Sequence, residues 1–190
     1  TRMKTIILSA GQGSRLLPLT EDRPKCLLSL GRQTILGVQL SALKAGGASE
    51  VVIVTGFRTA AVEKAAEQAS KPGFRVRTLF NPFYNVADNL ASCWMAREEM
   101  RGPFLLLNGD TLFRADIMTR LLQAPTAPIT LTIDKKSEYD SDDMKVKLDG
   151  TRLLDVGKTL EPEDTQGESI GFSRFDKAGA AAFVETLEQT

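Results

Sequence analysis

The chain of 190 residues contains no histidine. This absence excludes the Ser–His and Cys–His pairs in which an imidazole activates a nucleophile, and it removes the commonest zinc ligand. The chemistry that remains relies on carboxylates, lysine, arginine, backbone amides or a hard metal ion. Phosphoryl and nucleotidyl transfer suit that set, because they depend mainly on positioning and on neutralising charge.

Cysteine, net charge and long apolar runs are scarce as well. Cys26 and Cys93 form no CxxC pattern, which favours a cytoplasmic protein with reduced thiols. The formal charges cancel, which argues against a nucleic-acid partner. No apolar run approaches ~18 residues, so we expect no membrane span. The N-terminus also lacks the form of a signal peptide, and the length favours a single domain.

Short apolar runs alternate with helical patterns over the first two thirds of the chain. We expect strands at residues 5–9, 51–56, 76–80 and 104–110, and helices at 34–47, 59–70, 88–100 and 115–123. Thr59 is the expected N-cap of the second helix. Fully apolar strands alternating with helices predict a mainly parallel sheet with helices on both faces.

The pattern changes after residue 125. Further strands are expected at 128–134, 144–150, 152–158 and 169–175, with a hairpin turn at Asp149-Gly150 and a last helix after Asp176. We therefore predict an α/β fold: a three-layer, Rossmann-like domain with a mixed, mainly parallel sheet. Residues 3–125 would form its nucleotide-binding core and residues 126–190 a smaller acceptor-binding part.

The segment LSAGQGSRLLPLTEDRPKCLL (8–28) places glycines and cations directly after the first strand. In α/β sheets, ligands bind beyond the carboxyl ends of the strands. Gly11 and Gly13 let the backbone approach a ligand, and their amides with that of Ser14 can form an anion-binding concavity. Arg15 and Lys25 add full charges beside it, as a triphosphate site requires.

Other phosphate-binding loops fit this segment poorly. A dinucleotide-binding loop has the form GxGxxG, but Leu16 occupies the place of its third glycine. A Walker loop needs Gly-Lys-Ser/Thr, which is absent. A turn with incidental charges remains an alternative for a bare GxG, although the full pattern LxAGxGxRLxPLTxxxPKxL argues against it.

This long pattern resembles that of the sugar-1-phosphate nucleotidylyltransferases, and the similarity covers nearly the whole chain. The resemblance implies that Arg15 and Lys25 are catalytic cations on the phosphates. It also implies nucleotide-binding roles for a second set of residues: Leu8, Ala10, Gly11, Gly13, Ser14 and Gly109.

Asp110 lies in the segment LLLNGDTLF (105–113), at the carboxyl end of an expected buried strand. A carboxylate at the end of a buried strand is a suitable Mg²⁺ ligand, although it is also typical of a turn or a helix cap. The family has a magnesium-binding Asp in a matching Gly-Asp segment, so the resemblance implies Mg²⁺ as the cofactor and Asp110 as its ligand. The family also supplies a second metal-binding Asp further on, so we expect the C-terminal end to be missing from this chain.

The segment NPFYNVADNLASCWMA (81–96) resembles the phosphocholine cytidylyltransferase branch. That resemblance implies that Asn89 and Ser92 bind the nucleotide and that CTP is the favoured one. Plain helix capping by Asp88 or Asn89 is the alternative, and both can hold. Trp94, on the same helix, is expected to lie in the core.

The segments DMKVKLDG, VGKTL and SIGFSRF resemble the acceptor half of the same branch. Lys145, Lys158 and Gly171 would bind a small phosphorylated acceptor such as phosphocholine, unless the two lysines are merely exposed strand residues. Residues 134–168 hold eleven acidic against six basic side chains, which is compatible with a cationic acceptor.

The sequence thus predicts a Mg²⁺-dependent nucleotidyltransferase. It would move a nucleotidyl group from a nucleoside triphosphate, CTP favoured, to a phosphorylated acceptor and release pyrophosphate. Two alternatives stay open: a sugar 1-phosphate acceptor with UTP, dTTP or GTP, and a non-catalytic nucleotide-binding domain. A homo-oligomer is compatible with the sequence, which does not fix the oligomeric state.

Overall fold

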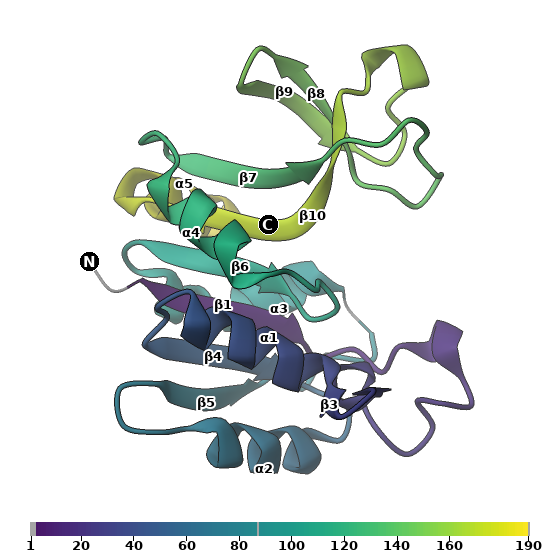
Figure 1. Cartoon of the computed structure of the whole chain (residues 1–190), viewed down its shortest axis with the longest axis vertical. Coiled ribbons are helices and arrows are strands. Elements are labelled where there is room, and N and C mark those ends of the chain that lie inside the picture. Colours follow the sequence, from purple (N-terminus) through teal and green to yellow (C-terminus); the bar gives the residue numbers. More distant parts are fainter. Residues whose placement is uncertain (1–2, 87, 190) are drawn as a thin grey trace. The chain divides into compact units, whose positions relative to one another are not determined.

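The computed structural model describes residues 3–86 and 88–189, which form two compact units (Figure 1). The first unit contains the chain up to Thr130 and again from Ser173, and the second unit is Leu131–Phe172. The sequence predicts one part at 126–190, whereas in the structure the residues from 173 onward belong to the first unit. The assignment of functions to the two parts stays a prediction.

The first unit is built on a parallel sheet with the strand order β5-β4-β1-β6. Its strands are β1 (Lys4–Ser9), β4 (Glu50–Thr55), β5 (Arg75–Phe80) and β6 (Phe104–Asn108). The register places Ile6 opposite both Val52 and Leu106. Strand β10 (Gly167–Phe175) continues the order beyond β6, and its residues 173–175 belong to this unit.

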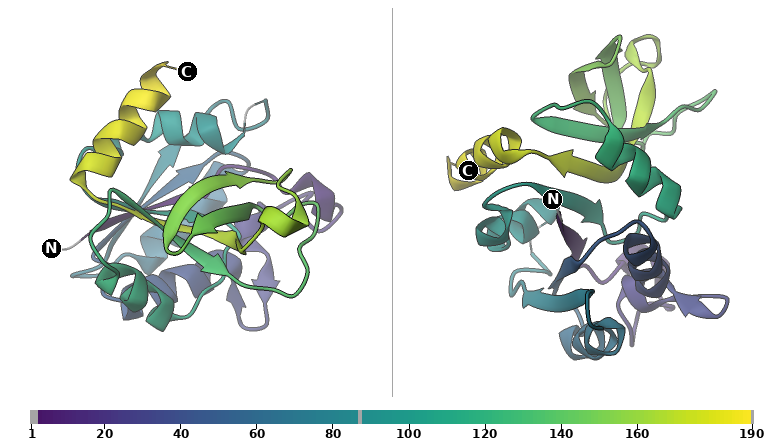
Figure 2. Two further views of the ribbon diagram at one scale, coloured as in Figure 1. Left: turned by 90° about the horizontal axis from the view of Figure 1, so that it is seen from above. Right: turned by 60° about the vertical axis from the view of Figure 1, so that its left-hand side comes forward.

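Helices cover both faces of this sheet, as Figures 1 and 2 show. They are α1 (Ile35–Ala45), α2 (Thr59–Ala69), α3 (Asn89–Met95), α4 (Ala115–Gln123) and α5 (Lys177–Gln189). Helices α1 and α4 contact each other on one face, and α3 and α5 do so on the other. The predicted three-layer α/β arrangement is confirmed for this unit.

The core under α3 and α5 is apolar and aromatic. Ile6 and Leu8 of β1 pack there with Phe104, Phe175 and other buried residues. The rings of Phe104 and Phe175 are stacked, with their centroids 4.5 Å apart. Because Ile6 and Leu8 belong to this core, the loop that follows β1 starts from a well-packed strand. Among the described residues, no helix is long and apolar enough to cross a bilayer.

Some local predictions differ from the structure. Helix α2 has Arg58 as its N-cap, in the left-handed region at φ 53°, whereas Thr59 instead lies with its hydroxyl 2.6 Å from that of Thr55. The helix expected at 88–100 divides into α3 and a 3-10 helix at Arg97–Met100. The short strands β2 (Ser29–Leu30) and β3 (Gln33–Thr34) were not predicted, because two residues carry no periodic pattern.

A buried arginine of β10 ties the end of α4 to the sheet within the first unit. Arg174 donates to the carbonyl oxygens of Leu121, Leu122, Ala124 and Pro125 at 2.7–3.2 Å. The last carbonyls of a helix have no partner within the helix, so this guanidinium serves as its C-terminal cap. Its role is structural.

An ion-pair network joins three strands of the first unit to the segment after α3. Glu99 accepts from Arg77 of β5 and from Lys4 of β1, and Arg77 also contacts Glu50 of β4. Hydrogen bonding from Arg77, helped by Lys4, lowers the pKa of Glu99 from 4.5 to about 2 despite partial burial. The network therefore stabilises the fold in its ionised form.

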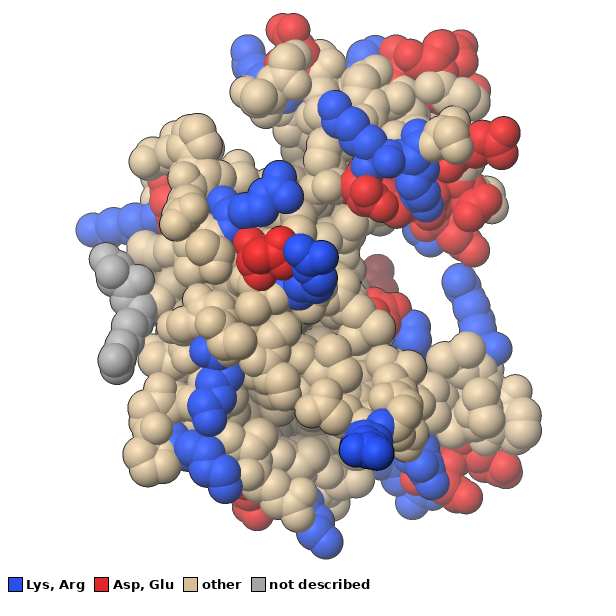
Figure 3. All heavy atoms as spheres, in the orientation of Figure 1, with Lys and Arg blue, Asp and Glu red and all other residues tan. Residues whose placement is uncertain are grey.

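The second unit is a small sheet in which β8 (Lys145–Asp149) lies between β9 (Arg152–Gly157) and β10, while β7 (Ile129–Asp134), which enters from the first unit, also pairs with β10. The expected hairpin turn is present, with Gly150 at φ 60°. On the face that Figure 3 shows, acidic and basic side chains are interspersed over this unit.

Candidate functional site

The glycine-rich loop leaves the carboxyl end of β1 and passes into a 3-10 helix at Ser14–Leu16. Gly13 is in the left-handed region at φ 77°, and a Cβ built there would lie 2.9 Å from the Cβ of Lys25. Glycine is therefore required at position 13 both for its backbone conformation and for the close approach of Lys25. Gly11 differs, because a Cβ there would meet nothing within 4 Å.

Two residues that the sequence analysis did not single out brace this loop. The hydroxyl of Thr20, fully buried, donates to the carbonyl of Gly13 at 2.9 Å. The amide of Gln12 donates to the carbonyl of Thr20 at 3.2 Å. The Thr of the Pro-Leu-Thr segment thus holds the loop closed, which explains that part of the pattern in structural terms.

Lys25 and Asp110 lie 85 residues apart in the chain but form an ion pair. The Nζ atom of Lys25 is 2.6 Å from Oδ2 of Asp110, and about half of the Asp110 side chain is exposed. Lys25 opens a short 3-10 helix after Pro24, and Asp110 follows β6. Asp110 caps no helix, because α4 begins at Ala115 with Arg114 as its N-cap.

A cavity of about 230 Å³ contains this pair, at the carboxyl ends of β1 and β6. Most of the residues predicted to bind nucleotide line it: Leu8, Gly11, Gly13, Asn89 and Gly109, with Ser9, Cys26 and Asn108 beside them. Gly109 fits only without a side chain, since a Cβ would lie 2.4 Å from the carbonyl oxygen of Leu8. Ala10 is buried beneath the loop and does not line the cavity.

Arg15 lies in an adjoining groove of about 600 Å³ rather than in this cavity. Ser14 lines the same groove, and Tyr84 and Asn85 lie across from the glycine loop. The loop glycines and Lys25 line both spaces, so the cavity and the groove share a wall.

The start of α3 brings one of its two predicted residues to the cavity. Asn89 lines it, whereas Ser92 is buried and its hydroxyl accepts from the amide of Asn81 at 3.0 Å. Asp88 is the N-cap of the helix and accepts from the amide of Leu90. Ser92 therefore supports the entry of the chain into α3 and does not open onto the cavity.

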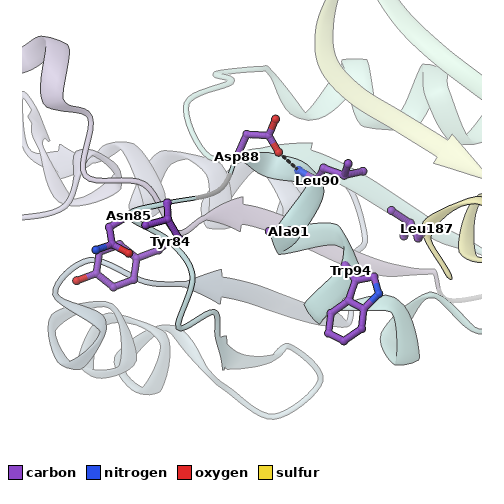
Figure 4. Close-up of a pocket in the computed structure, with 8 residues that line it drawn as sticks. Tyr84, Asn85, Asp88, Leu90, Ala91, Trp94 and Leu187 are labelled. Carbon is purple, nitrogen blue, oxygen red and sulfur yellow. Dashed lines mark hydrogen bonds between the residues drawn. The ribbon is translucent and has the colours of Figure 1, made fainter. Parts of the chain in front are cut away.

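A further cavity, of about 730 Å³, runs along α3 (Figure 4). Trp94 and Leu187 lie at one end of it, and Tyr84 and Asn85 at the other. Trp94 is 43% exposed, so its expected place in the core was wrong. The guanidinium carbon of Arg97 lies over its ring, 3.7 Å from the centroid.

Neither a thiol nor a metal-binding cluster offers other chemistry in the described part of the chain. Burial raises the pKa of the Cys26 thiol to about 12, so it stays protonated and is no nucleophile. Among residues 3–86 and 88–189, no three acidic, His or Cys side chains come together to hold a metal ion. Asp110 supplies the carboxylate of the cavity.

The predicted acceptor-binding residues belong to the second unit. Lys145 is 7% exposed, and its Nζ donates to the carbonyl of Lys158 at 2.7 Å. The Nζ of Lys158 is 3.4 Å from Asp142, and Gly171 is in the left-handed region at φ 77°. Within this unit Lys145 also lines a cavity of about 650 Å³, which Lys158 and Gly171 do not line.

Comparison with known proteins identifies the family. The model of the family described as nucleotidyl transferase matches residues 4–142. The chain belongs to the nucleotidyl transferase family. The resemblance inferred from residues 8–28 is thereby confirmed, and the match includes the glycine loop, Lys25, the start of α3 and Asp110.

Several cytidylyltransferases are similar to this nucleotidyl transferase. Choline-phosphate cytidylyltransferase from Streptococcus pneumoniae is 30% identical over 112 residues, which cover 59% of this chain and 47% of the relative. CTP:phosphoglutamine cytidylyltransferase from Campylobacter jejuni is 23% identical over an alignment covering 98% of this chain and 79% of the relative. This chain thus matches less than half the length of the first relative.

A solved structure shows the same fold. The CTP:phosphocholine cytidylyltransferase of Streptococcus pneumoniae superimposes on this chain with a TM-score of 0.79 at 24% identity. The superposition covers 100% of this chain and 77% of that one. The predicted α/β nucleotidyltransferase fold is confirmed.

Proposed function

We propose that this protein transfers a nucleotidyl group, most readily from CTP, to a small phosphorylated acceptor and releases pyrophosphate. The observation that carries the proposal is the Lys25–Asp110 pair in a cavity walled by glycines. It puts a cation, a carboxylate and closely approachable backbone side by side, as a nucleoside triphosphate with its metal ion requires. The similar cytidylyltransferases support CTP as the donor.

The chemistry follows from the groups at hand. A phosphate oxygen of the acceptor attacks the α-phosphorus of the nucleotide, and the bond from that phosphorus to the bridging oxygen of the β-phosphate breaks in line. Backbone amides of the glycine loop hold the triphosphate, and Lys25 and Arg15 neutralise the negative charge that grows on the leaving pyrophosphate. No covalent intermediate on the protein is needed, which agrees with a buried, protonated Cys26 and the absence of histidine.

The cavity fits Mg²⁺ bound together with the nucleotide. Asp110 already takes one cationic partner here, and Mg²⁺ typically uses one or two carboxylates with phosphate oxygens and water. When bound, the ion would neutralise phosphate charge and orient the triphosphate. Asp110 would hold it, and Lys25 would then turn toward the phosphates.

The base and the acceptor are proposed on narrower grounds. Asn89, at the cavity, would offer its amide to the base, with Ser92 supporting it from within α3. We assign acceptor binding to the second unit, with Lys158 and Gly171 as contacts and Lys145 tied to the Lys158 backbone. The two units would act as one nucleotidyltransferase domain, and two buried free thiols agree with a cytoplasmic location.

Pyrophosphate release with Mg²⁺ tests this function. CTP, UTP, GTP, ATP and dTTP are each combined with phosphocholine, inositol phosphate, aminoethylphosphonate and a sugar 1-phosphate. We expect release with CTP and one alcohol phosphate or phosphonate. Release only with a sugar 1-phosphate and another nucleotide would show that the donor and the acceptor differ from those proposed, while the transfer reaction is the same. CTP binding without release from any pair would contradict the transferase and favour a binding domain.

A further inference from the structure

Gln39 is a buried polar residue on the apolar side of α1. Its neighbours on that side are Ile35, Leu36, Leu40 and Leu43, and its own side chain is fully buried. A primary amide in such surroundings is unfavourable unless its groups find hydrogen-bond partners. An apolar residue of the same size would avoid this cost. The hydrogen bonds of the amide must therefore account for a glutamine at this position.

The partners of this amide are the two carbonyls on either side of the Gly109-Asp110 pair. The Nε2 atom of Gln39 donates to the carbonyl of Asn108 and to that of Thr111, each at 2.9 Å. Both of its hydrogens are used, so the contact fixes both ends of the turn. The amide of Thr111 also donates to the carbonyl of Asn108 at 3.2 Å, which closes the turn on itself.

The position of the Asp110 carboxylate depends on this turn. Half of that side chain is exposed, so its backbone and the ion pair with Lys25, rather than packing, hold it in place. The turn also rests on β1, because Gly109 approaches the carbonyl oxygen of Leu8 too closely for a side chain. The turn thus contacts both the backbone of β1 and one side chain of α1.

We propose that Gln39 is a positioning residue for Asp110, holding the turn that presents this carboxylate to Mg²⁺ and the triphosphate. The inference rests on the proposed function, because it assumes that Asp110 holds the metal ion. Gln39 touches neither ligand. It acts through the two carbonyls, and its own Oε1 has no hydrogen-bond partner among the described residues.

Gln39→Met tests the proposal, since methionine keeps the length of the side chain and removes both donors. The Mg²⁺ concentration for half-maximal pyrophosphate release from CTP should rise ~10- to 100-fold, the range found when residues that orient metal ligands are removed. The rate at saturating Mg²⁺ should change less than the metal requirement. The affinity of the protein–CTP complex for Mn²⁺, measured by electron paramagnetic resonance, should fall by a similar factor. This readout does not depend on turnover.

Two further variants separate positioning from general damage. Thr5→Val removes a buried hydroxyl from β1 that has no partner among the described residues, and it should leave the metal requirement unchanged. Gln39→Glu keeps the shape and, when protonated, one donor. Its metal requirement should lie between those of the wild type and Gln39→Met, and nearest the wild type at low pH. It also replaces Gln39→Met if that variant fails to fold.

The outcomes distinguish this inference from the proposed function. If Asp110→Ala changes the metal requirement while a folded Gln39→Met behaves as the wild type, the function stands and the inference is wrong. If Gln39→Met weakens CTP binding equally with and without metal, its role is structural and the inference is wrong again. If the wild type neither binds CTP nor releases pyrophosphate, the proposed function fails first.

Discussion

Alanine substitutions at three glycines allow the effects of backbone strain, side-chain crowding and ligand contact to be measured separately. Gly13 and Gly31 both have positive φ, 77° and 64°, so alanine at either position should destabilise the fold by about 1–2 kcal/mol. They differ in space, because the new Cβ meets nothing within 4 Å at Gly31, in the β2–β3 turn. At Gly13 it lies 2.9 Å from the Cβ of Lys25.

Lys25 must therefore withdraw by ~0.5 Å in Gly13→Ala to reach an ordinary contact, since such contacts begin near 3.4 Å. A misplacement of ~1 Å in a reacting site can lower turnover by about 100-fold, so we expect Gly13→Ala to lose roughly 10-fold or more. Gly31→Ala should lose only the stability that backbone strain costs, and it should keep its activity.

Gly11→Ala completes the set. Its Cβ meets nothing in the free protein, so the free energy of unfolding should stay close to that of the wild type, while CTP binding weakens if the loop backbone touches the triphosphate. Urea unfolding, calorimetric titration with CTP and pyrophosphate release measure the three effects. Full activity of Gly13→Ala, or an equal loss of activity in Gly31→Ala, would show that crowding of Lys25 does not control turnover.

Three other variants test the described contacts. Glu99→Gln should lower the free energy of unfolding at neutral pH by at most ~3 kcal/mol, from a pKa of about 2 against 4.5. Because the folded-state pKa is depressed, the wild type loses this advantage as the pH falls from 4.5 toward 2, so urea titrations of the two should converge; a constant gap would contradict the assignment. Arg174→Met should destabilise by roughly 3 kcal/mol or more, since it leaves the buried carbonyl of Leu121 and the partly buried carbonyls of Ala124 and Pro125 without their donor. A free energy of unfolding within about 1 kcal/mol of the wild type would count against that role. Cys26→Ser should keep pyrophosphate release, and native Cys26 should resist iodoacetamide at pH 8 by mass spectrometry; rapid alkylation would show the thiol to be more accessible than described.

The sequence predicted the layered fold of the first unit well, because its strands and helices have strong local patterns. Strands β1, β4 and β6 contain apolar runs followed by polar turns. For these three and for the more polar β5, each predicted start lies within one residue of the observed one. The N-cap of α2 was wrong for a local reason: Thr59 pairs with the hydroxyl of Thr55, and Arg58 takes the left-handed conformation instead.

The candidate site could be predicted only where a motif carried it. Lys25 and Asp110 belong to the family pattern, and the structure brings them together across 85 residues. Thr20 and Gln39 act through backbone carbonyls, which a sequence does not display. The sequence gives one indication of Gln39, a polar residue among the leucines of α1. Its partners could not be predicted, because they are backbone carbonyls at the end of β6 and in the turn after it.

The most direct test of the site compares Asp110→Ala with Asp116→Ala. Both carboxylates pair with a cation, Asp110 with Lys25 at 2.6 Å and Asp116 with Arg114 at 2.9 Å, but only Asp110 lines the cavity. Pyrophosphate release from CTP is measured with the acceptor that the wild type uses best, over a range of Mg²⁺ concentrations. We expect Asp110→Ala to lose magnesium-dependent turnover and Asp116→Ala to retain it. Wild-type turnover in Asp110→Ala at every Mg²⁺ concentration would contradict it.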